Sequence, residues 1–235
     1  MAHSNAIKLE AVIFDLFGTL VEDFMLSIGA SNINLAEILG VPHEPFGQMW
    51  RQTTDMRVSG TFQSVEAAIV HVCDAINAPA APKQLERAVR SRLQQIKGGL
   101  KPKPDAIETL TRLKQSGCKL GLLSNCSIEI PTLWPETEFG NLFDSTVFSS
   151  RERLKKPDPS IFRLACERLG VAPEACLYVA DGENYELAAA GQVGLQPLLI
   201  RNHLSHRRPK LFREAQEWRG DIISALSELV ALAGS

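Results

Sequence analysis

Short apolar runs of this chain end in side chains that could do chemistry. They end at Asp15, Ser124 and Asp181. A lysine, Lys156, lies in a polar stretch between the last two, and Glu186 follows Asp181 by five residues. A carboxylate at the tip of a strand can act as a nucleophile. A hydroxyl and an ammonium group suit an anionic group held against that carboxylate, because both donate hydrogen bonds and one is charged. The residue types therefore indicate chemistry on an anionic substrate.

Three of these groups, Asp15, Asp181 and Glu186, are acids, whereas Lys156 carries a positive charge. Carboxylates that converge on a single lysine repel one another and shift one another's pKa values unless a cation lies among them. A hard divalent ion with oxygen ligands meets that need. Mg²⁺ is the ion that we expect.

Five apolar runs of strand type must position these residues. They cover residues 11–14, 118–123, 146–148, 176–180 and 198–200, and a polar residue follows each run. Helical patterns fill the gaps, as in Asp105–Ser116 and Asp158–Leu169, each of which is followed by a glycine. Strands that alternate with such helices predict an α/β fold with a Rossmann-like, doubly wound parallel sheet. Ligands of such sheets bind outside the carboxyl ends of the strands, where the polar residues lie.

The stretch from 23 to 98 has a different pattern. Its apolar residues repeat at helical spacing in 34–39, 65–76 and 84–96, with no convincing strand between them. We expect an inserted all-helical cap at 23–98 and a Rossmann-like catalytic core made of 1–22 and 99–235. The tail from 221 to 233 predicts a closing amphipathic helix.

The composition excludes several classes of protein. The 235 residues include 25 Lys and Arg against 27 Asp and Glu, so the formal charge is −2, and 45% of the residues are apolar. This balance argues against a nucleic-acid partner and against an anionic membrane surface, and no apolar run reaches the ~18 residues of a membrane span. Five scattered cysteines favour a reducing cytoplasm. We expect a monomer or homodimer that acts on a small anionic substrate.

The polar segments also occur in a distinctive order. They read Asp15-Leu16-Phe17-Gly18-Thr19, then Ser124-Asn125, then Lys156-Pro157, then Asp181-Gly182-Glu183-Asn184-Tyr185-Glu186. This order resembles the four motifs of the haloacid dehalogenase-like hydrolase superfamily, with 23–98 in the place of its helical cap. The resemblance implies that Asp15 is the nucleophile and forms a covalent aspartyl intermediate, and that Ser124 and Lys156 assist it. It also implies Mg²⁺ held by Asp15, the main-chain carbonyl of Phe17 and Asp181, with Glu186, or alternatively Glu183, acting through water.

Phe17 departs from the phosphatases of this superfamily, which usually carry a second Asp two residues after the nucleophile. An aromatic residue followed by Gly18 and Thr19 looks instead like the L-2-haloacid dehalogenase branch, which needs no metal. Charge favours the phosphatase, because an unneutralised Asp181 would oppose the binding of an anionic haloacid. At an effective dielectric near 20, two like charges about 4 Å apart cost roughly 4 kcal/mol.

Three functions therefore stay open. The first is a Mg²⁺-dependent phosphatase for a small phosphorylated metabolite, and slow turnover of alkyl monoesters is expected because Phe17 cannot supply a proton. The second is an (S)-2-haloacid dehalogenase with Asp15 as the nucleophile. The third is a protein that binds metal and phosphate with little or no turnover.

Six residues are candidates for contact with the substrate: Phe17, Gly18, Thr19, Asn125, Arg51 and Arg57. The first four lie in the motifs named above. Arg51 and Arg57 belong to the helical insertion, where a guanidinium could pair with a distal anion of the substrate through a bidentate fork. The alternative is that both lie on a solvated cap surface.

Overall fold

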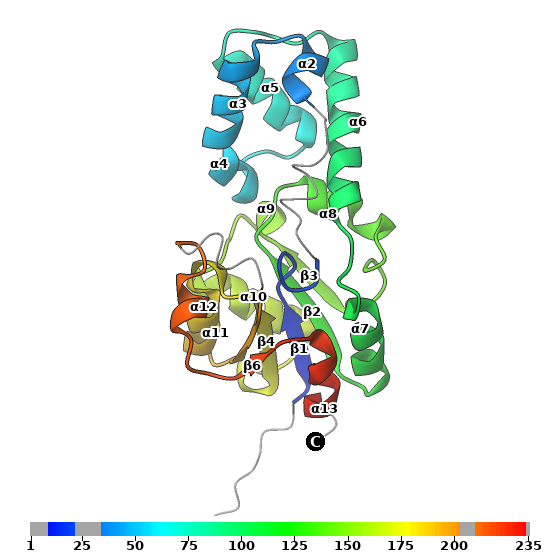
Figure 1. Cartoon of the computed structure of the whole chain (residues 1–235), viewed down its shortest axis with the longest axis vertical. Coiled ribbons are helices and arrows are strands. Elements are labelled where there is room, and N and C mark those ends of the chain that lie inside the picture. The colour runs from blue at the N-terminus through cyan, green and yellow to red at the C-terminus, as the bar shows by residue number, and fades with distance from the viewer. Residues whose placement is uncertain (1–8, 22–33, 203–209, 234–235) are drawn as a thin grey trace, which may run out of the picture.

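The structure is a computed structural model that describes residues 9–21, 34–202 and 210–233 (Figure 1). A parallel sheet with helices on both faces forms one part of the molecule, and a group of helices extends from the end of the sheet. The first residues of the expected cap, 23–33, lie outside the described ranges.

Six parallel strands form the sheet in the order β3-β2-β1-β4-β5-β6. They are β1 (Ala11–Phe14), β2 (Lys119–Ser124), β3 (Ser145–Phe148), β4 (Cys176–Ala180), β5 (Gln196–Ile200) and β6 (Ile222–Ile223). The α/β class and the first five strands agree with the sequence prediction. The continuous helix predicted at 221–233 is wrong, because Ile222 and Ile223 pair with β5 and only Leu229–Ala233 is α-helical (α13).

The side chains of β1 alternate between two apolar layers. Val12 and Phe14 belong to a buried cluster that also contains residues of α7 (Ala106–Gln115). Ile13 belongs to a second cluster, which contains residues of α10 (Pro159–Leu169). Because successive residues of a strand point to opposite faces, one helix layer on each face buries the whole strand.

The remaining helices connect the strands or close the ends of the sheet. They are α8 (Glu129–Leu133), α9 (Ser149–Glu152), α11 (Glu186–Val193), α12 (Arg213–Glu217) and short 3-10 turns at Trp134–Glu136, Pro173–Ala175, Glu183–Tyr185 and Leu226–Glu228. Both boundaries of α10 follow local rules. Asp158 accepts a hydrogen bond from the Ser160 N–H as the N-cap, and Gly170 ends the helix in a left-handed conformation.

Helices α2 to α6 have an apolar core of their own. They are α2 (Leu35–Leu39), α3 (His43–Gln52), α4 (Thr54–Val58), α5 (Val65–Ala75) and α6 (Pro82–Gly99). Leu39, Phe46 and Ile69 are among the buried residues of this core. The group extends from the carboxyl end of the sheet (Figure 1), and we call α2 to α6 the helical unit. The limits 23–98 for a functional cap stay a prediction.

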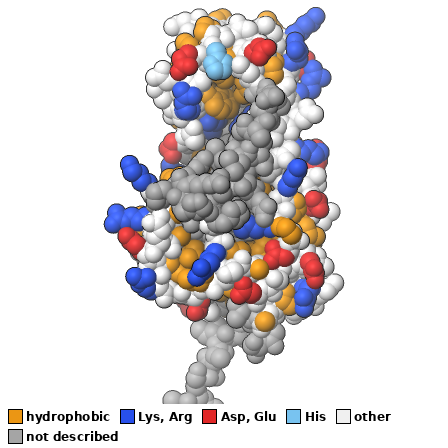
Figure 2. Space-filling view, in the orientation of Figure 1, with side chains coloured by type: hydrophobic (Ala, Val, Ile, Leu, Met, Phe, Trp, Pro, Cys, Tyr) orange, Lys and Arg blue, Asp and Glu red, His pale blue; other side chains and the backbone are white. Residues whose placement is uncertain are grey.

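Charged side chains of both signs are scattered over the described parts of the face in Figure 2. This mixture agrees with the nearly balanced composition of the chain. Across the residues that the structure describes, no helix combines the length and the apolar character needed to cross a bilayer.

Candidate active site

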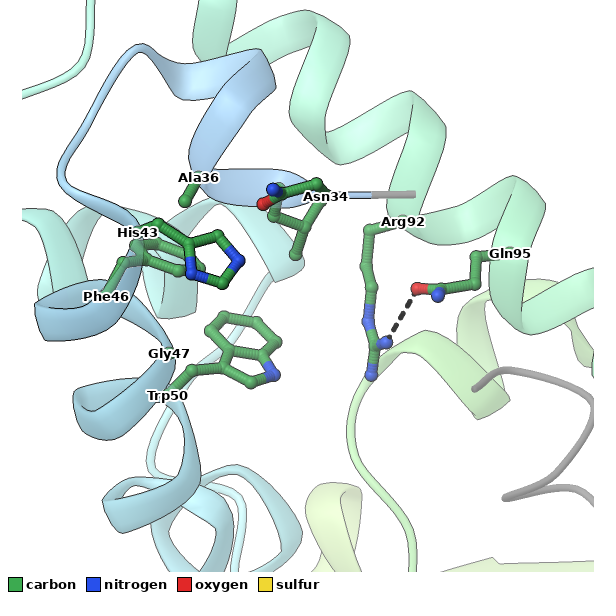
Figure 3. Close-up of a pocket in the computed structure, with 9 residues that line it drawn as sticks. Asn34, Ala36, His43, Phe46, Gly47, Trp50, Arg92 and Gln95 are labelled. Atoms are coloured by element: carbon green, nitrogen blue, oxygen red, sulfur yellow. Dashed lines mark hydrogen bonds between the residues drawn. The ribbon is translucent and has the colours of Figure 1, made fainter. Parts of the chain in front are cut away.

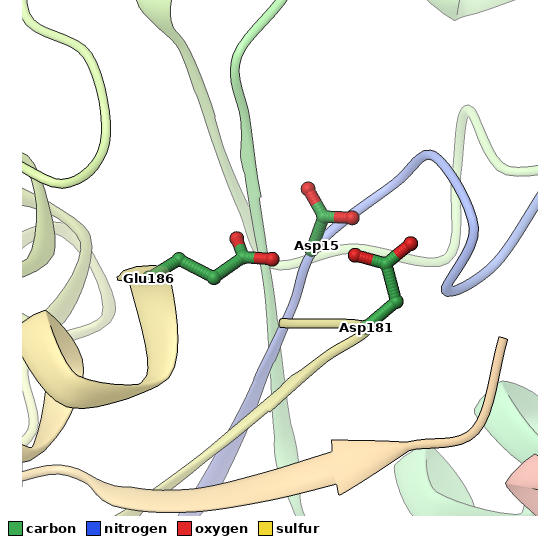
Figure 4. Close-up of side chains that lie close together, drawn as sticks. All are labelled: Asp15, Asp181 and Glu186. Atoms are coloured by element: carbon green, nitrogen blue, oxygen red, sulfur yellow. The ribbon is translucent and has the colours of Figure 1, made fainter. Parts of the chain in front are cut away.

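The structure brings the carboxylates of Asp15, Asp181 and Glu186 together at the carboxyl end of the sheet (Figure 4). One oxygen of each lies within 4.8 Å of the others, and all three residues are buried. Asp15 follows β1, Asp181 follows β4 and Glu186 begins α11. β1 and β4 are neighbours, and the Asp15 N–H donates to the Val179 carbonyl at 3.0 Å. The strand ends therefore place two of the acids side by side.

Lys156 lies against this cluster and is 5% exposed. Its Nζ donates to Asp15 Oδ1 at 2.5 Å and to Glu186 Oε2 at 2.6 Å. Burial opposes the charged ammonium, but Asp15 and Glu186 outweigh that effect and raise the pKa of Lys156 above its ordinary value. Lys156 is therefore a permanent positive charge against the carboxylate of Asp15.

Asn125 positions Lys156 through the main chain. The Asn125 Nδ2 donates to the Lys156 carbonyl at 3.0 Å, and its Oδ1 accepts the Lys156 N–H at 2.8 Å. This pair of bonds fixes the backbone that carries the ammonium group. The structure gives the Asn125 amide these partners within the protein, and its contact with a substrate stays a prediction.

Asp181 has one oxygen that the protein does not use. Its Oδ2 accepts a hydrogen bond from Asn202 Nδ2 at 2.8 Å, whereas Oδ1 is buried and has no hydrogen-bond partner among the described residues. Burial, together with the charges of Glu186 and Asp15, raises the pKa of Asp181 well above its ordinary value. A buried carboxylate is costly to keep charged unless a cation neutralises it.

Glu186 faces Lys156 and Tyr178. Its Oε2 accepts a hydrogen bond from the Tyr178 hydroxyl at 2.7 Å as well as the bond from Lys156. Burial raises the pKa of Glu186 to about 7, and the charge of Asp15 adds to this while Lys156 opposes it. Glu186, and not Glu183, belongs to the acidic cluster of the described residues.

The acidic cluster fits a hard divalent cation. Three carboxylates face one ammonium group, and the charge of Lys156 is already shared between Asp15 and Glu186. The oxygen without a partner, Asp181 Oδ1, lies in the same cluster. Oxygen donors of this kind are the ligands that Mg²⁺ prefers. The main-chain carbonyl of Phe17 stays a predicted ligand.

Gly18 lets Asp181 approach the loop after β1. Its φ is +77°, and a Cβ at this position would lie 1.9 Å from Asp181 Oδ2 and 2.5 Å from Asn202 Nδ2. Only a residue without a side chain leaves room for this contact. The Nζ of Lys103, which follows the helical unit in the sequence, donates to the Gly18 carbonyl at 2.5 Å and so holds the same loop. Gly18 thus shapes the site through its backbone.

Phe17, Thr19 and Ser124 lie close to Asp15 in the fold. Phe17 is half-buried and packs against the apolar cluster of β1. Thr19 and Ser124 are fully buried, and the Thr19 hydroxyl has no hydrogen-bond partner within the described part of the chain. Contacts of these three residues with a substrate stay predictions.

The two arginines of the helical unit have different surroundings. Arg51 is exposed on α3. Arg57 is buried, donates to the Trp50 carbonyl at 2.7 Å and to Thr53 Oγ1 at 2.8 Å, and stacks 4.0 Å from the centre of the Trp50 ring. The expectation of a solvated surface is wrong for Arg57, because its own helical unit encloses it. None of these contacts reaches the acidic cluster.

Sequence reasoning missed two residues of the site, Tyr178 and Asn202. Tyr178 lies within an apolar strand, but a buried tyrosine hydroxyl needs a hydrogen-bond partner, and this signal could have linked it to a polar site. Asn202 follows β5 by two residues, at the same edge of the sheet as Asp15 and Asp181. Its position after a parallel strand was the available signal.

Curated relatives of the chain have more than one activity. (S)-2-haloacid dehalogenase 4A of Burkholderia cepacia is 28% identical over 198 residues, which cover 82% of this chain and 83% of the relative. Glyceraldehyde 3-phosphate phosphatase of Methanopyrus kandleri is 33% identical over 127 residues, 54% of each chain.

A solved structure supports the fold. L-2-haloacid dehalogenase from Xanthobacter autotrophicus aligns with a TM-score of 0.61 at 20% identity, over 97% of this chain and 99% of that chain. The model of the haloacid dehalogenase-like hydrolase family matches residues 9–194, which include Asp15, Lys156, Asp181 and Glu186. The chain belongs to the haloacid dehalogenase-like hydrolases.

Proposed function

We propose that this hydrolase is a Mg²⁺-dependent phosphatase that transfers a phosphoryl group from a small metabolite to Asp15. The observation that carries the proposal is the buried Asp181 Oδ1, which has no hydrogen-bond partner among the described residues and lies in the acidic cluster. A relative with a phosphatase name supports the same activity.

The charges of the site favour this function. Lys156 pairs with Asp15 and Glu186, so the charge of Asp181 has no cationic partner in the described contacts. Two like charges about 4 Å apart cost roughly 4 kcal/mol at an effective dielectric near 20. An anionic substrate adds further negative charge, and a divalent cation on Asp15 and Asp181 offsets it.

Asp15, Asp181 and the Phe17 carbonyl would hold the cation, with Glu186 linked to it through water. When bound, the cation supplies electrostatic stabilisation of the transferring phosphoryl oxygens. Lys156 holds the Asp15 carboxylate at 2.5 Å and keeps one of its oxygens oriented. The bond from Asp15 to phosphorus forms as the bond to the leaving oxygen breaks, and the Ser124 hydroxyl donates to a phosphoryl oxygen. Water then hydrolyses the aspartyl phosphate.

Phe17 limits which leaving groups can depart. Its ring cannot donate a proton, and loss of a general acid or base typically lowers a rate by about 10²- to 10⁴-fold. The rates for aryl and acyl phosphates should fall least without a general acid, because their leaving groups are weakly basic. We therefore expect these classes to be the better substrates and alkyl monoesters to be slow.

A phosphatase screen tests the proposal. Aryl, acyl and sugar phosphates are incubated with the protein in Mg²⁺ or in chelator, beside the Asp15→Asn variant. We expect phosphate release in Mg²⁺ alone, and at least a hundredfold less from Asp15→Asn. Equal release in chelator, or release by Asp15→Asn at the rate of the natural protein, would contradict the mechanism.

A haloacid dehalogenase is the second candidate, because Phe17 stands where a phosphatase usually carries an acid and a dehalogenase relative covers 82% of the chain. In that reaction Asp15 attacks the carbon that bears the halogen, and halide leaves. Halide release from (S)-2-chloropropionate in chelator decides between the two. Release that depends on Asp15 and needs no metal would replace the phosphatase proposal.

A further inference from the structure

A cavity of about 430 Å³ lies in the helical unit between α2, α3 and α6 (Figure 3). Trp50, Phe46 and His43 line one side, and Arg92 and Gln95 lie across from them. Among the described residues that line it, none is an Asp or a Glu. We propose that this cavity binds an aromatic carboxylate, with the ring beside Trp50 and Phe46 and the carboxylate on Arg92.

Among the described residues, positive charge exceeds negative charge around Trp50, which lines the cavity. Arg92 Nε donates to Glu129 Oε1 at 2.9 Å, and its Nη1 donates to Gln95 Oε1 at 3.0 Å. The guanidinium of Arg57 stacks 4.0 Å from the centre of the Trp50 ring, and that of Arg92 lies 5.5 Å from it. Arg92 pairs with Glu129, whose charge also acts on Arg57, so within the described part of the chain two guanidinium groups face one buried carboxylate.

This excess affects Arg57. Burial lowers the pKa of Arg57 to about 10, and the charge of Arg92 adds to that effect while Glu129 opposes it. An anion in the cavity would stabilise both guanidinium groups. Because Arg57, Arg92 and Glu129 leave an excess of one positive charge among the described residues, a carboxylate balances it, whereas a phosphate dianion would leave a surplus of negative charge. An arginine also binds a carboxylate in a geometry that matches its planar fork.

The aromatic side chains of the cavity favour a ligand that carries an aromatic ring. Phe46 and Trp50 form a stacked pair with ring centroids 5.8 Å apart, and His43 lies next to them in the cavity (Figure 3). A ring gains both burial and edge-to-face contacts against such a pair. A cavity of this size is in the range that holds small organic ligands. The proposal goes beyond the phosphatase function, since neither Asp15 nor Asp181 lines this cavity.

Calorimetric titration with 1-naphthoate tests the proposal. We expect the Arg92→Met variant to bind at least about tenfold more weakly, because a charge-assisted hydrogen bond is lost. Arg90→Met is the matched control, since Arg90 lies on the same helix and its side chain is 70% exposed. Its affinity for 1-naphthoate should equal that of the natural protein. An Arg92→Met variant that binds as tightly as Arg90→Met would overturn the proposal.

Two further titrations use a protein with Arg92 intact. The neutral isostere 1-naphthamide should bind the natural protein at least about tenfold more weakly than 1-naphthoate does. The Asp15→Asn protein in chelator should keep its full affinity for 1-naphthoate. Equal affinity for the amide would exclude recognition of the charge, and loss of binding in Asp15→Asn would assign the ligand to the acidic cluster. Neither result depends on whether the protein is a phosphatase.

Discussion

The single positive charge of Lys156 is directed at Asp15 and Glu186 and not at Asp181. Lys156 lies 2.5 Å from Asp15 and 2.6 Å from Glu186, so two carboxylates share its one positive charge. Asp181 receives a hydrogen bond from the neutral amide of Asn202, and its other oxygen is buried without a partner in the described residues. Asp181 is therefore the side chain that the proposed cation would neutralise, and substitutions around it should report on metal binding.

Gly18→Ala should disrupt the site by moving Asp181. The new Cβ would lie 1.9 Å from Asp181 Oδ2, so the carboxylate must shift. We expect Mg²⁺-dependent phosphatase activity to fall by at least about a hundredfold, on the scale of a misplaced reacting group. A left-handed φ of +77° adds a folding cost of about 1–2 kcal/mol.

Gly117→Ala separates these two effects. Gly117 has a φ of +87°, and no atom lies within 4 Å of the position of its Cβ. This variant should lose similar stability in urea denaturation and keep its activity. If Gly18→Ala and Gly117→Ala lose activity to the same extent, the contact with Asp181 does not matter to catalysis.

Phe17→Asp should restore a proton donor two residues after the nucleophile. We expect turnover of alkyl phosphates, such as a panel of sugar phosphates, to rise by at least about tenfold, because general acid–base catalysis contributes about 10²- to 10⁴-fold when it is well placed. Phe17→Asn serves as the control, because an asparagine side chain has nearly the same size as an aspartic acid but cannot donate a proton to the leaving group. A Phe17→Asp enzyme no faster than Phe17→Asn would show that the missing proton donor is not the limit.

Each element brings its chemical groups to the site because it ends at the same edge of the sheet. β1 lies between β2 and β4 in the parallel sheet, and Phe14 is in register with Leu122 and Val179. In parallel strands the carboxyl ends meet at one edge, where ligands bind. Lys156 comes from the loop before α10, so the start of that helix also affects the position of the ammonium group.

Asp158→Ala should weaken α10 at its N-terminus. Asp158 accepts the Ser160 N–H at 2.8 Å, and removal of such a cap costs about 1 kcal/mol of the free energy of unfolding. Asp158→Asn keeps an acceptor and should lose only a few tenths of this value. Urea denaturation of the three proteins at pH 7 measures the difference.

The effect of Asp158→Ala should also depend on pH. The hydrogen bond from Ser160 lowers the pKa of Asp158 below its ordinary value of 3.8. A lowered pKa in the folded state means that the stabilisation is present above 3.8 and is lost as the pH falls through the lowered value. The advantage of the natural protein over Asp158→Ala should therefore shrink in acid. An equal difference at pH 7 and at the acid end would contradict the role of the charged form.

In the whole molecule, the helical unit is joined to the sheet-containing part close to the acidic cluster. Ser149 Oγ, at the start of α9, donates to the Val58 carbonyl at 2.7 Å, and Lys155, next to Lys156, forms an ion pair with Asp55. The ion pair between the partly buried Arg92 and the buried Glu129 joins α6 to α8. The helical unit therefore rests on the loops that carry the catalytic candidates, and we expect it to exclude water from a bound substrate.

The unfolding temperature of the Asp181→Asn variant should show whether Asp181 binds the proposed cation. In chelator this variant should unfold at a higher temperature than the natural protein, because burial and the neighbouring acids raise the pKa of Asp181 and its charge opposes folding at pH 7. In Mg²⁺ at 100 times its Kd the order should reverse, since such binding adds about 2.7 kcal/mol, or roughly 5 to 10 °C.

Asp74→Asn is the control for Asp181→Asn, because Asp74 is exposed on α5 and distant in sequence from the cluster. Its unfolding temperature should respond to Mg²⁺ as that of the natural protein does. Asp181→Asn and the natural protein gaining equally from Mg²⁺ would show that Asp181 is not a ligand.

The sequence by itself determined the α/β class, five of the six strands and the polar residues that follow them. Apolar runs with polar ends are local patterns, and a parallel sheet converts them into one edge of functional groups. It did not reveal β6, because Ile222 and Ile223 precede an apolar stretch with helical character and their pairing depends on β5, more than 20 residues earlier.

Only the tertiary structure decided which partner each charged group takes. Lys156 is 141 residues from Asp15 in the sequence, yet they lie 2.5 Å apart, while Asp181 Oδ1 has no partner among the described residues. The fit of Gly18 against Asp181 and the enclosure of Arg57 are likewise contacts between side chains or loops whose directions are set by packing. Local periodicity fixes where a strand ends, but the distances between charges, and so their pKa values and their fit to the proposed cation, arise only when distant segments pack together.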